Sequence, residues 1–278
     1  MHIGLYIFAT DDAIRIDELA RAAEARGFES LWVPEHTHIP TSRRTPFPGG
    51  EPLPREYAHT LDPFVSLTAA AMVTTRLKVG TSICLIIERD PIITAKEVAS
   101  LDLLSNGRFL FGIGAGWNAE EMENHGTTYK TRYSLLAERV RAMKEIWTKQ
   151  AAEFHGRFVN FDPLWAWPKP VQQPHPPILL GGEGRQALQR VIELCDGWFP
   201  RGRNPERLLQ ALPDFWERAA RAGRDPKTLS ISAFATPPDA AVIDRFAAAG
   251  ITRALLRLPS EDRDTILPLL DQYAKLIR

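Results

Sequence analysis

Apolar runs of strand length alternate with amphipathic helical segments along the whole chain, and this alternation constrains the fold more than any other feature. It is typical of a parallel sheet whose strands are joined by crossover helices. Eight strand-like runs favour a closed (β/α)8 barrel, the TIM barrel, over an open sheet. The runs lie near residues 3–8, 30–33, 77–83, 109–113, 178–180, 197–199, 229–233 and 252–256.

The segments between the runs carry helix start and stop signals. An apolar stripe that begins at Ile16 recurs at helical spacing and ends at Gly27, a C-terminal stop signal. Asp62 and Asp90 are each followed by proline, which indicates an N-cap and the first helical position. One barrel takes roughly 250 residues, so we expect residues 1–278 to form a single domain.

Two segments interrupt the alternation and are predicted to be loop insertions. Residues 34–60, rich in proline, glycine, arginine and threonine, follow the second strand and are expected on the carboxyl-end face of the barrel. Residues 149–177 follow a helix, so part of this segment is expected along the outside or the bottom of the barrel.

The charge balance favours small-molecule partners. The formal net charge is zero, and neither a nucleic acid nor an anionic membrane is expected without a concentrated basic face. The chain starts with an apolar strand, without features of a signal peptide, and no apolar run approaches ~20 residues, so we expect a cytoplasmic protein. Cys84 and Cys195 show no metal-ligand spacing and are expected to be buried free thiols.

Active-site residues of such barrels follow the strands, and Glu35 and His36 follow the second one. A carboxylate and an imidazole there can contact a cofactor and transfer a proton near neutral pH. The alternative is a polar pair in a surface loop. His38 completes a His-x-His pattern, but a metal site needs further ligands that the sequence does not place nearby, so no metal is expected.

Two glycine-rich turns also follow strands. Residues 112–117 do not match a dinucleotide fingerprint, because its third glycine would fall on Trp117. These glycines allow the backbone to approach a flat ring, or they simply form a tight turn. Residues 181–184 precede a helix whose free N–H groups can bind phosphate. Arg201 and Arg203 follow the next strand and either supply the countercharge or are solvated loop residues.

Five segments, in order, carry a family resemblance: LWVPEH, LKVGTSICLIIERDP, LDLLSNGRFLFGIGAGW, PKPVQQPHPPILLGG and CDGWFP. Together they resemble the luciferase-like monooxygenases, and most of all their branch of F420-dependent oxidoreductases. The resemblance covers residues 3–201, and the remainder resembles the family only as generic β/α units. It implies a TIM barrel that holds a flavin or deazaflavin above the carboxyl ends of its strands.

The resemblance also implies roles for particular residues. It makes His36 the proton donor or acceptor and Glu35 a ring contact, and it implies a non-prolyl cis peptide at Ser82–Ile83 beneath the ring. Trp117 stands where sugar-phosphate dehydrogenase relatives have a catalytic glutamate, which leaves His36 without its usual acidic partner. The implied cofactor-binding residues are Glu35, Thr81, Ser82, Ile83, Gly114, Ala115, Gly116, Trp117, Gly181, Gly182 and Arg201.

The implied activity is hydride transfer between coenzyme F420 and a small organic substrate. One alternative is an FMN-dependent monooxygenase that uses reduced FMN and oxygen and is fed by a separate flavin reductase. A second is a non-catalytic flavin-binding barrel. The resemblance also implies a homodimer packed through the helices of the second and third β/α units. Candidates for the wall of an aromatic pocket are Phe8, Trp32, Tyr57 and Trp117, with packing in the core as the alternative for each.

Overall fold

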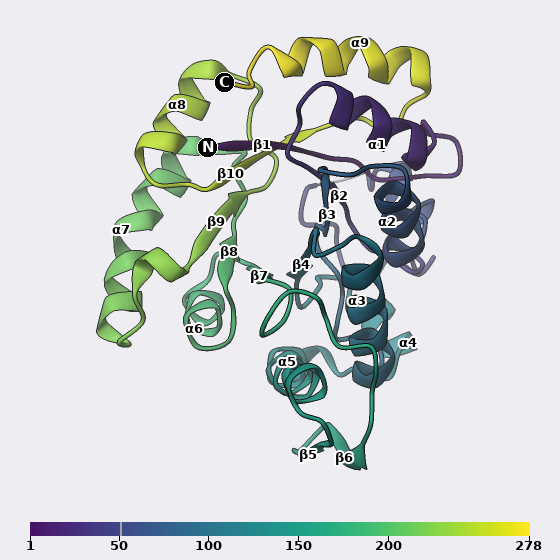
Figure 1. The fold of residues 1–278 in the computed structure, drawn as a ribbon, viewed down its shortest axis with the longest axis vertical. Helices are drawn as coiled ribbons and strands as arrows, with labels where there is room; N and C mark the ends of the chain where they lie inside the picture. Colours follow the sequence, from purple (N-terminus) through teal and green to yellow (C-terminus); the bar gives the residue numbers. More distant parts are fainter. Residues whose placement is uncertain (51) are drawn as a thin grey trace.

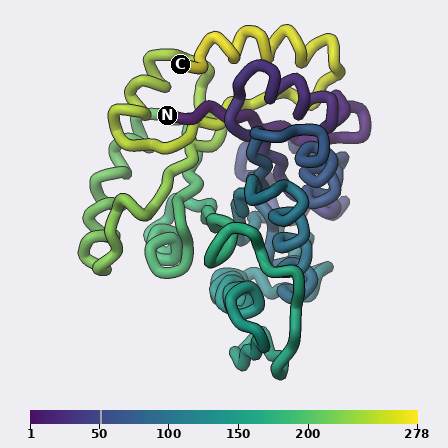
Figure 2. Tube along the Cα trace, viewed as in Figure 1, coloured from purple at the N-terminus to yellow at the C-terminus, as the bar shows by residue number. Residues whose placement is uncertain are grey.

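In the computed structural model, which describes residues 1–50 and 52–278, eight parallel strands close into a barrel surrounded by helices (Figure 1). The spatial order is β1-β10-β9-β8-β7-β4-β3-β2. The first and last strands lie side by side and close the barrel (Figure 2), with Leu5 opposite Leu256. On its other side Leu5 lies opposite Leu31. The predicted TIM barrel is confirmed.

The barrel strands are β1 (His2–Tyr6), β2 (Ser30–Val33), β3 (Lys78–Thr81), β4 (Phe109–Ile113), β7 (Ile178–Gly181), β8 (Gly197–Phe199), β9 (Ser230–Ala233) and β10 (Arg253–Arg257). The helices are α1 (Ile16–Ala25), α2 (Pro63–Met72), α3 (Pro91–Leu104), α4 (Ala119–Asn124), α5 (Arg132–Thr148), α6 (Arg185–Leu194), α7 (Pro205–Arg221), α8 (Ala240–Ala248) and α9 (Arg263–Ala274), with short 3-10 turns at Arg55–Ala58, Tyr129–Thr131 and Pro226–Thr228. None of these helices is both long enough and apolar enough to span a membrane.

The predicted helix signals act as expected. The Asp62 carboxylate accepts a hydrogen bond from the Val65 amide at 3.0 Å and caps α2. Asp90 caps α3 in the same way through the amides of Ile92 and Ile93. After α1, Gly27 adopts a φ of +85°, a left-handed conformation that favours glycine.

The second predicted insertion contains a structure that the sequence did not indicate. Strands β5 (Ala152–His155) and β6 (Asn160–Leu164) form an antiparallel hairpin outside the barrel, next to α5 (Figure 1). The Glu138 carboxylate of α5 accepts hydrogen bonds from the amides of Phe158 and Val159 at 2.7 and 3.1 Å. The hairpin is therefore attached to the outer helix layer and not to the sheet.

Aromatic side chains fill the barrel interior beneath its carboxyl-end face. Trp32 is fully buried, and its indole N–H donates to the Ser30 hydroxyl at 2.8 Å. A Cβ at Gly80 would lie 2.5 Å from the Trp32 ring, so only glycine fits there. Trp32 was a candidate for the pocket wall, but the structure places it in the core. Phe8 is also buried, and its ring packs 4.6 Å from that of Tyr57.

Candidate active site

A cavity of about 330 Å³ opens at the carboxyl ends of the barrel strands. The cavity lies at the place where TIM barrels carry their active sites. Of the predicted cofactor-binding residues, those that line it are Ser82, Ile83, Gly114, Ala115, Gly116, Trp117, Gly181, Gly182 and Arg201. Tyr133, Glu183, Phe199 and Phe234 also line it and were not in the predicted set.

The floor of the cavity is formed by the Ser82–Ile83 peptide, which is cis, as the resemblance implied. Glycine backbone approaches Ile83 from two strands. A Cβ at Gly114 would lie 2.5 Å from Ile83 Cδ1, and one at Gly181 would lie 3.4 Å from Ile83 Cγ2. These positions leave a smooth apolar surface around Ile83, which is suited to a flat ring.

Thr81 does not line the cavity, although it was predicted to contact the cofactor. It is fully buried, and its hydroxyl donates to the Gly112 carbonyl at 2.6 Å. A Cβ at Gly112 would lie 2.0 Å from the Thr81 carbonyl oxygen. Thr81 and Gly112 therefore hold β3 and β4 together beneath the cavity floor.

His36 has an acidic partner, which corrects the expectation that Trp117 leaves it without one. His36 Nδ1 lies 2.7 Å from Glu121 Oε2, and the two side chains are only 7% and 1% exposed. The imidazole ring packs against Tyr57 and against Trp117, with ring centroids 5.2 and 5.9 Å apart. Because Nδ1 is engaged by Glu121, Nε2 is the nitrogen left to exchange a proton.

Glu121 comes from α4, a short helix that begins two residues after Trp117. The signal was present in the sequence, since the run FGIGAGWNAEE, which starts within β4, ends in Glu120 and Glu121. A six-residue helix carries too little periodicity to show which of the two glutamates faces inward. The fold decides it, because His36 follows β2 and meets α4 across β3.

Glu35 is not among the residues that line the cavity. Its carboxylate is 2% exposed and accepts hydrogen bonds from the Leu85 amide and from Arg89 Nε, both at 2.6 Å. Both oxygens are therefore used to attach the end of β2 to the loop after β3. Arg89 also binds Asp62 at 2.6 Å, which extends the ionic network to the start of α2.

The first predicted insertion, apart from residue 51, packs over α4. Glu120 accepts hydrogen bonds from the Thr45 amide at 2.9 Å and from the Ser42 hydroxyl at 3.2 Å. The Phe47 ring lies 5.6 Å from the Trp117 ring and 5.0 Å from that of Tyr57. These contacts hold the insertion against α4 and against the aromatic rings that pack on His36.

Glu88 is a buried carboxyl group that the sequence did not single out. Its side chain is 1% exposed, and neither oxygen has a hydrogen-bond partner among the described residues. A Cβ at Gly116 would lie 3.9 Å from Glu88 Oε1, so the carboxyl group lies beneath the cavity lining. Burial, together with the nearby charges of Glu121 and Glu35, raises the pKa of Glu88 from 4.5 to about 9. Glu88 is therefore a neutral acid at pH 7.

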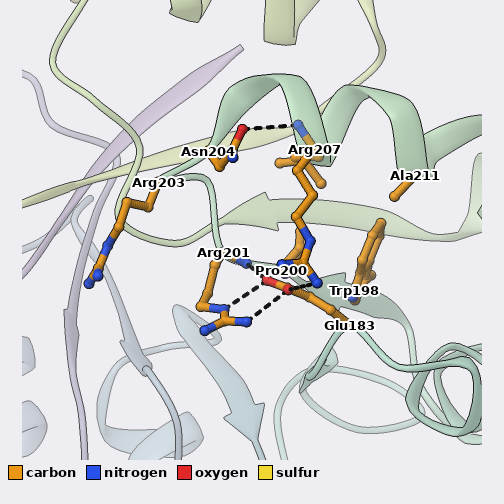
Figure 3. A pocket seen from close by; sticks show the side chains of 9 residues that line it. Glu183, Trp198, Pro200, Arg201, Arg203, Asn204, Arg207 and Ala211 are labelled. Atoms are coloured by element: carbon orange, nitrogen blue, oxygen red, sulfur yellow. Dashed lines mark hydrogen bonds and ion pairs between the residues drawn. The ribbon is translucent and has the colours of Figure 1, made fainter. Parts of the chain in front are cut away.

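Arg201 lies at the cavity edge and is already paired. Its guanidinium donates to both oxygens of Glu183 at 2.9 Å, and Arg207 lies 3.6 Å from the same carboxylate (Figure 3). A second cavity of about 220 Å³ begins on the other side of this pair. We call it the arginine cavity. It is lined by Glu183, Trp198, Pro200, Arg201, Arg203, Asn204, Arg207, Leu208 and Ala211.

His38 is part of a hydrogen-bonded loop. Its Nδ1 lies 2.9 Å from the Thr37 hydroxyl, and its Nε2 lies 2.8 Å from the Asn124 side-chain amide. Within residues 1–50 and 52–278, no three His, Cys, Asp or Glu side chains are grouped to hold a metal ion. Cys84 and Cys195 are free and buried, as predicted.

A parallel barrel with a cavity at the carboxyl ends of its strands and a buried acid–base pair beside it has the organisation of a TIM-barrel enzyme. The chain belongs to the luciferase-like monooxygenase family, because the sequence model of that family matches residues 3–258. The family resemblance predicted from the sequence is confirmed.

Three relatives illustrate the range of the family. An uncharacterized protein of Mycobacterium tuberculosis is 40% identical over 280 residues, which cover 99% of this chain and 98% of that protein. The F420-dependent hydroxymycolic acid dehydrogenase of the same species is 28% identical over 234 residues, 81% of this chain and 60% of that protein. The FMNH2-dependent dimethylsulfone monooxygenase of Pseudomonas putida is 32% identical over 152 residues, 54% of this chain and 42% of that protein.

Solved structures show the same fold. A monooxygenase from Streptomyces bottropensis superposes with a TM-score of 0.81 at 19% identity, covering 100% of this chain and 98% of that chain. The coenzyme F420-dependent tetrahydromethanopterin reductase from Methanopyrus kandleri has a TM-score of 0.74 at 18% identity, covering 100% and 99%. The same fold therefore occurs in proteins that are named for different cofactors and reactions.

Proposed function

We propose that the protein is an oxidoreductase in which coenzyme F420 exchanges a hydride with a small organic substrate. The observation that carries the proposal is the buried His36–Glu121 pair, whose imidazole packs against Trp117 of the cavity wall. F420 is preferred to FMN because the F420-dependent relative matches 81% of this chain, whereas the FMNH2-dependent relative matches 54%.

The residues of the cavity fit a flat cofactor. Its volume of about 330 Å³ lies within the usual range of ligand pockets, roughly 300–1,000 Å³. The glycine backbone around Ile83 supplies a cradle that side chains would fill. We place the ring over Ser82–Ile83 and the phosphate at the turn formed by residues 181–184, directly before α6, where free N–H groups favour an anion.

When bound, the deazaflavin supplies a hydride to a substrate carbon or accepts one from it. His36 Nε2 gives the matching proton to the substrate oxygen, or takes it in the reverse direction. Glu121 holds the imidazole in one orientation through Nδ1 and stabilises its positive charge when it is protonated. Trp117 and Tyr57 pack against the imidazole and shield it from water.

Titration of the purified apoprotein with F420 and with FMN, followed by fluorescence, tests the choice of cofactor. We expect F420 to bind at low micromolar concentration or tighter, and FMN to bind at least about tenfold more weakly, a difference of about 1.4 kcal/mol. Micromolar binding of FMN without a response to F420 would instead assign the protein to the FMN-dependent monooxygenases.

A homodimer is the second part of the proposal. Apolar side chains are exposed on two helices that pack against each other, α2 and α3, including Val65 at 71% and Ile93 at 60%. Clustered exposed apolar residues mark association surfaces. In sedimentation velocity we expect a dimer for the wild type and a monomer for Ile93→Glu. Gln272→Glu on α9 is the control, and it should remain dimeric. A monomeric wild type at micromolar concentration would refute the dimer.

A further inference from the structure

The arginine cavity shares part of its lining with the cavity over Ser82–Ile83. Glu183 and Arg201 line both cavities. The indole N–H of Trp198, which lines the arginine cavity, donates to the Gly182 carbonyl at 2.7 Å. The turn assigned to the cofactor phosphate is thus fastened to the lining of the second cavity. A ligand whose phosphate lies at the turn of residues 181–184 would therefore extend into the arginine cavity if its chain continued beyond the phosphate.

The charge of this cavity is strongly positive in a protein whose formal net charge is zero. Arg201, Arg203 and Arg207 line it together with one carboxylate, Glu183. Glu183 lies between Arg201 and Arg207, whereas Arg203 points away from this group (Figure 3). Arg203 forms no ion pair within the part of the chain that the structure describes. Two positive charges therefore remain without a compensating carboxylate.

The lining is not only cationic. Trp198 is buried, and with Leu208 and Ala211 it supplies the apolar part of the lining. A surface of this kind suits a flexible chain that carries carboxylates on short aliphatic segments. A single small inorganic anion would leave the apolar part of the lining uncovered. Guanidinium groups bind carboxylates through strong, charge-assisted hydrogen bonds.

We propose that the arginine cavity binds the acidic chain that coenzyme F420 carries beyond its phosphate. The proposal rests on the function proposed above and deepens it, because FMN ends at its phosphate and has nothing to place there. The arginine cavity thus favours F420 over FMN through the part of the cofactor beyond the phosphate, at a distance from the reacting ring. Arg203 and Arg207 contribute charge, and Arg201 marks the passage between the two cavities.

The test compares three ligands on the wild type and on the variants Arg203→Gln and Arg207→Gln. The ligands are F420, FMN and the deazaflavin riboside that lacks both the phosphate and the acidic chain. Both arginines are exposed, so the fold is expected to tolerate the changes, and melting curves check this. Arg221→Gln is the matched control, because Arg221 lies at the other end of α7 from Arg207 and is paired with Glu217.

We expect each variant to weaken F420 binding about tenfold, the size of one partly exposed charge-assisted contact. Affinity for the riboside and for FMN should stay within about twofold, and Arg221→Gln should resemble the wild type. The salt dependence of F420 binding should decrease in both variants, since screening acts on the lost charge. Unchanged F420 affinity in both variants, or equal weakening of F420 and the riboside, would overturn the proposal. If neither F420 nor the riboside binds the wild type, the proposed function fails and the subsite fails with it.

Discussion

Replacing His36 with asparagine is expected to lower kcat by about a hundredfold or more, the usual contribution of a positioned general acid or base. Asparagine keeps a polar side chain beside Glu121 but cannot transfer a proton near pH 7. The affinity for F420 should change by less than about twofold, because His36 is assigned to the substrate oxygen, whereas the ring is placed over Ser82–Ile83. A loss in kcat without a loss of cofactor affinity identifies a proton-transfer role.

The measurement is the steady-state oxidation of reduced F420 by whichever carbonyl compound the wild type reduces fastest in a panel. His38→Asn is the matched control. His38 lies two residues away but is hydrogen-bonded to Thr37 and Asn124, outside the cavity. This control should keep wild-type turnover, and Glu121→Gln should show an intermediate loss, because it weakens the support of the imidazole. Full activity of His36→Asn with every accepted substrate would remove His36 from the mechanism.

Replacing Glu88 with glutamine is expected to change how the stability of the protein depends on pH. The pKa of Glu88 is raised from 4.5 to about 9 by burial and by the charges of Glu121 and Glu35. Between these two pH values the folded chain holds a proton that the unfolded chain has lost. The free energy of unfolding of the wild type therefore decreases as pH rises, by up to about 1.4 kcal/mol per pH unit from this residue.

Glutamine does not titrate, so the variant lacks this decrease. Between pH 6 and pH 8 we expect the variant to gain about 2 to 3 kcal/mol of stability relative to the wild type. Urea denaturation at pH 6, 7 and 8 measures the difference. Glu123→Gln, an exposed residue of α4 paired with Arg44, should keep the wild-type slope. Parallel pH profiles for the wild type and Glu88→Gln would show that Glu88 is ionised in the folded protein.

The parts of the fold that the sequence predicted are those set by local signals. The alternation of strands and helices predicted the barrel, and caps such as Asp62 and Asp90 act within three residues of themselves. The β5–β6 hairpin was missed because its side chains are mostly exposed, so they give no apolar alternation. Pro163 within β6 also argues against a strand in the sequence.

In the candidate site, too, the sequence predicted what local signals set and missed contacts between distant residues. Residues next to the strand ends were found, since parallel strands bring all of them to one face. The pairing of Glu35 with Arg89 was not predicted, because Arg89 lies 54 positions further along the chain. Glu121 lies 85 positions from His36, and no spacing rule connects them. A carboxylate in a buried ion pair and one that contacts a ligand look alike in a sequence, and only tertiary contacts distinguish them.

A crystal structure of the protein with bound F420 tests the central claim most directly. The claim predicts a deazaflavin ring lying on Ser82–Ile83, with its phosphate at the turn of residues 181–184. It also predicts that the reacting carbon faces His36 Nε2. A ring bound outside this cavity, or bound in it with its reacting carbon turned away from His36, would contradict the account.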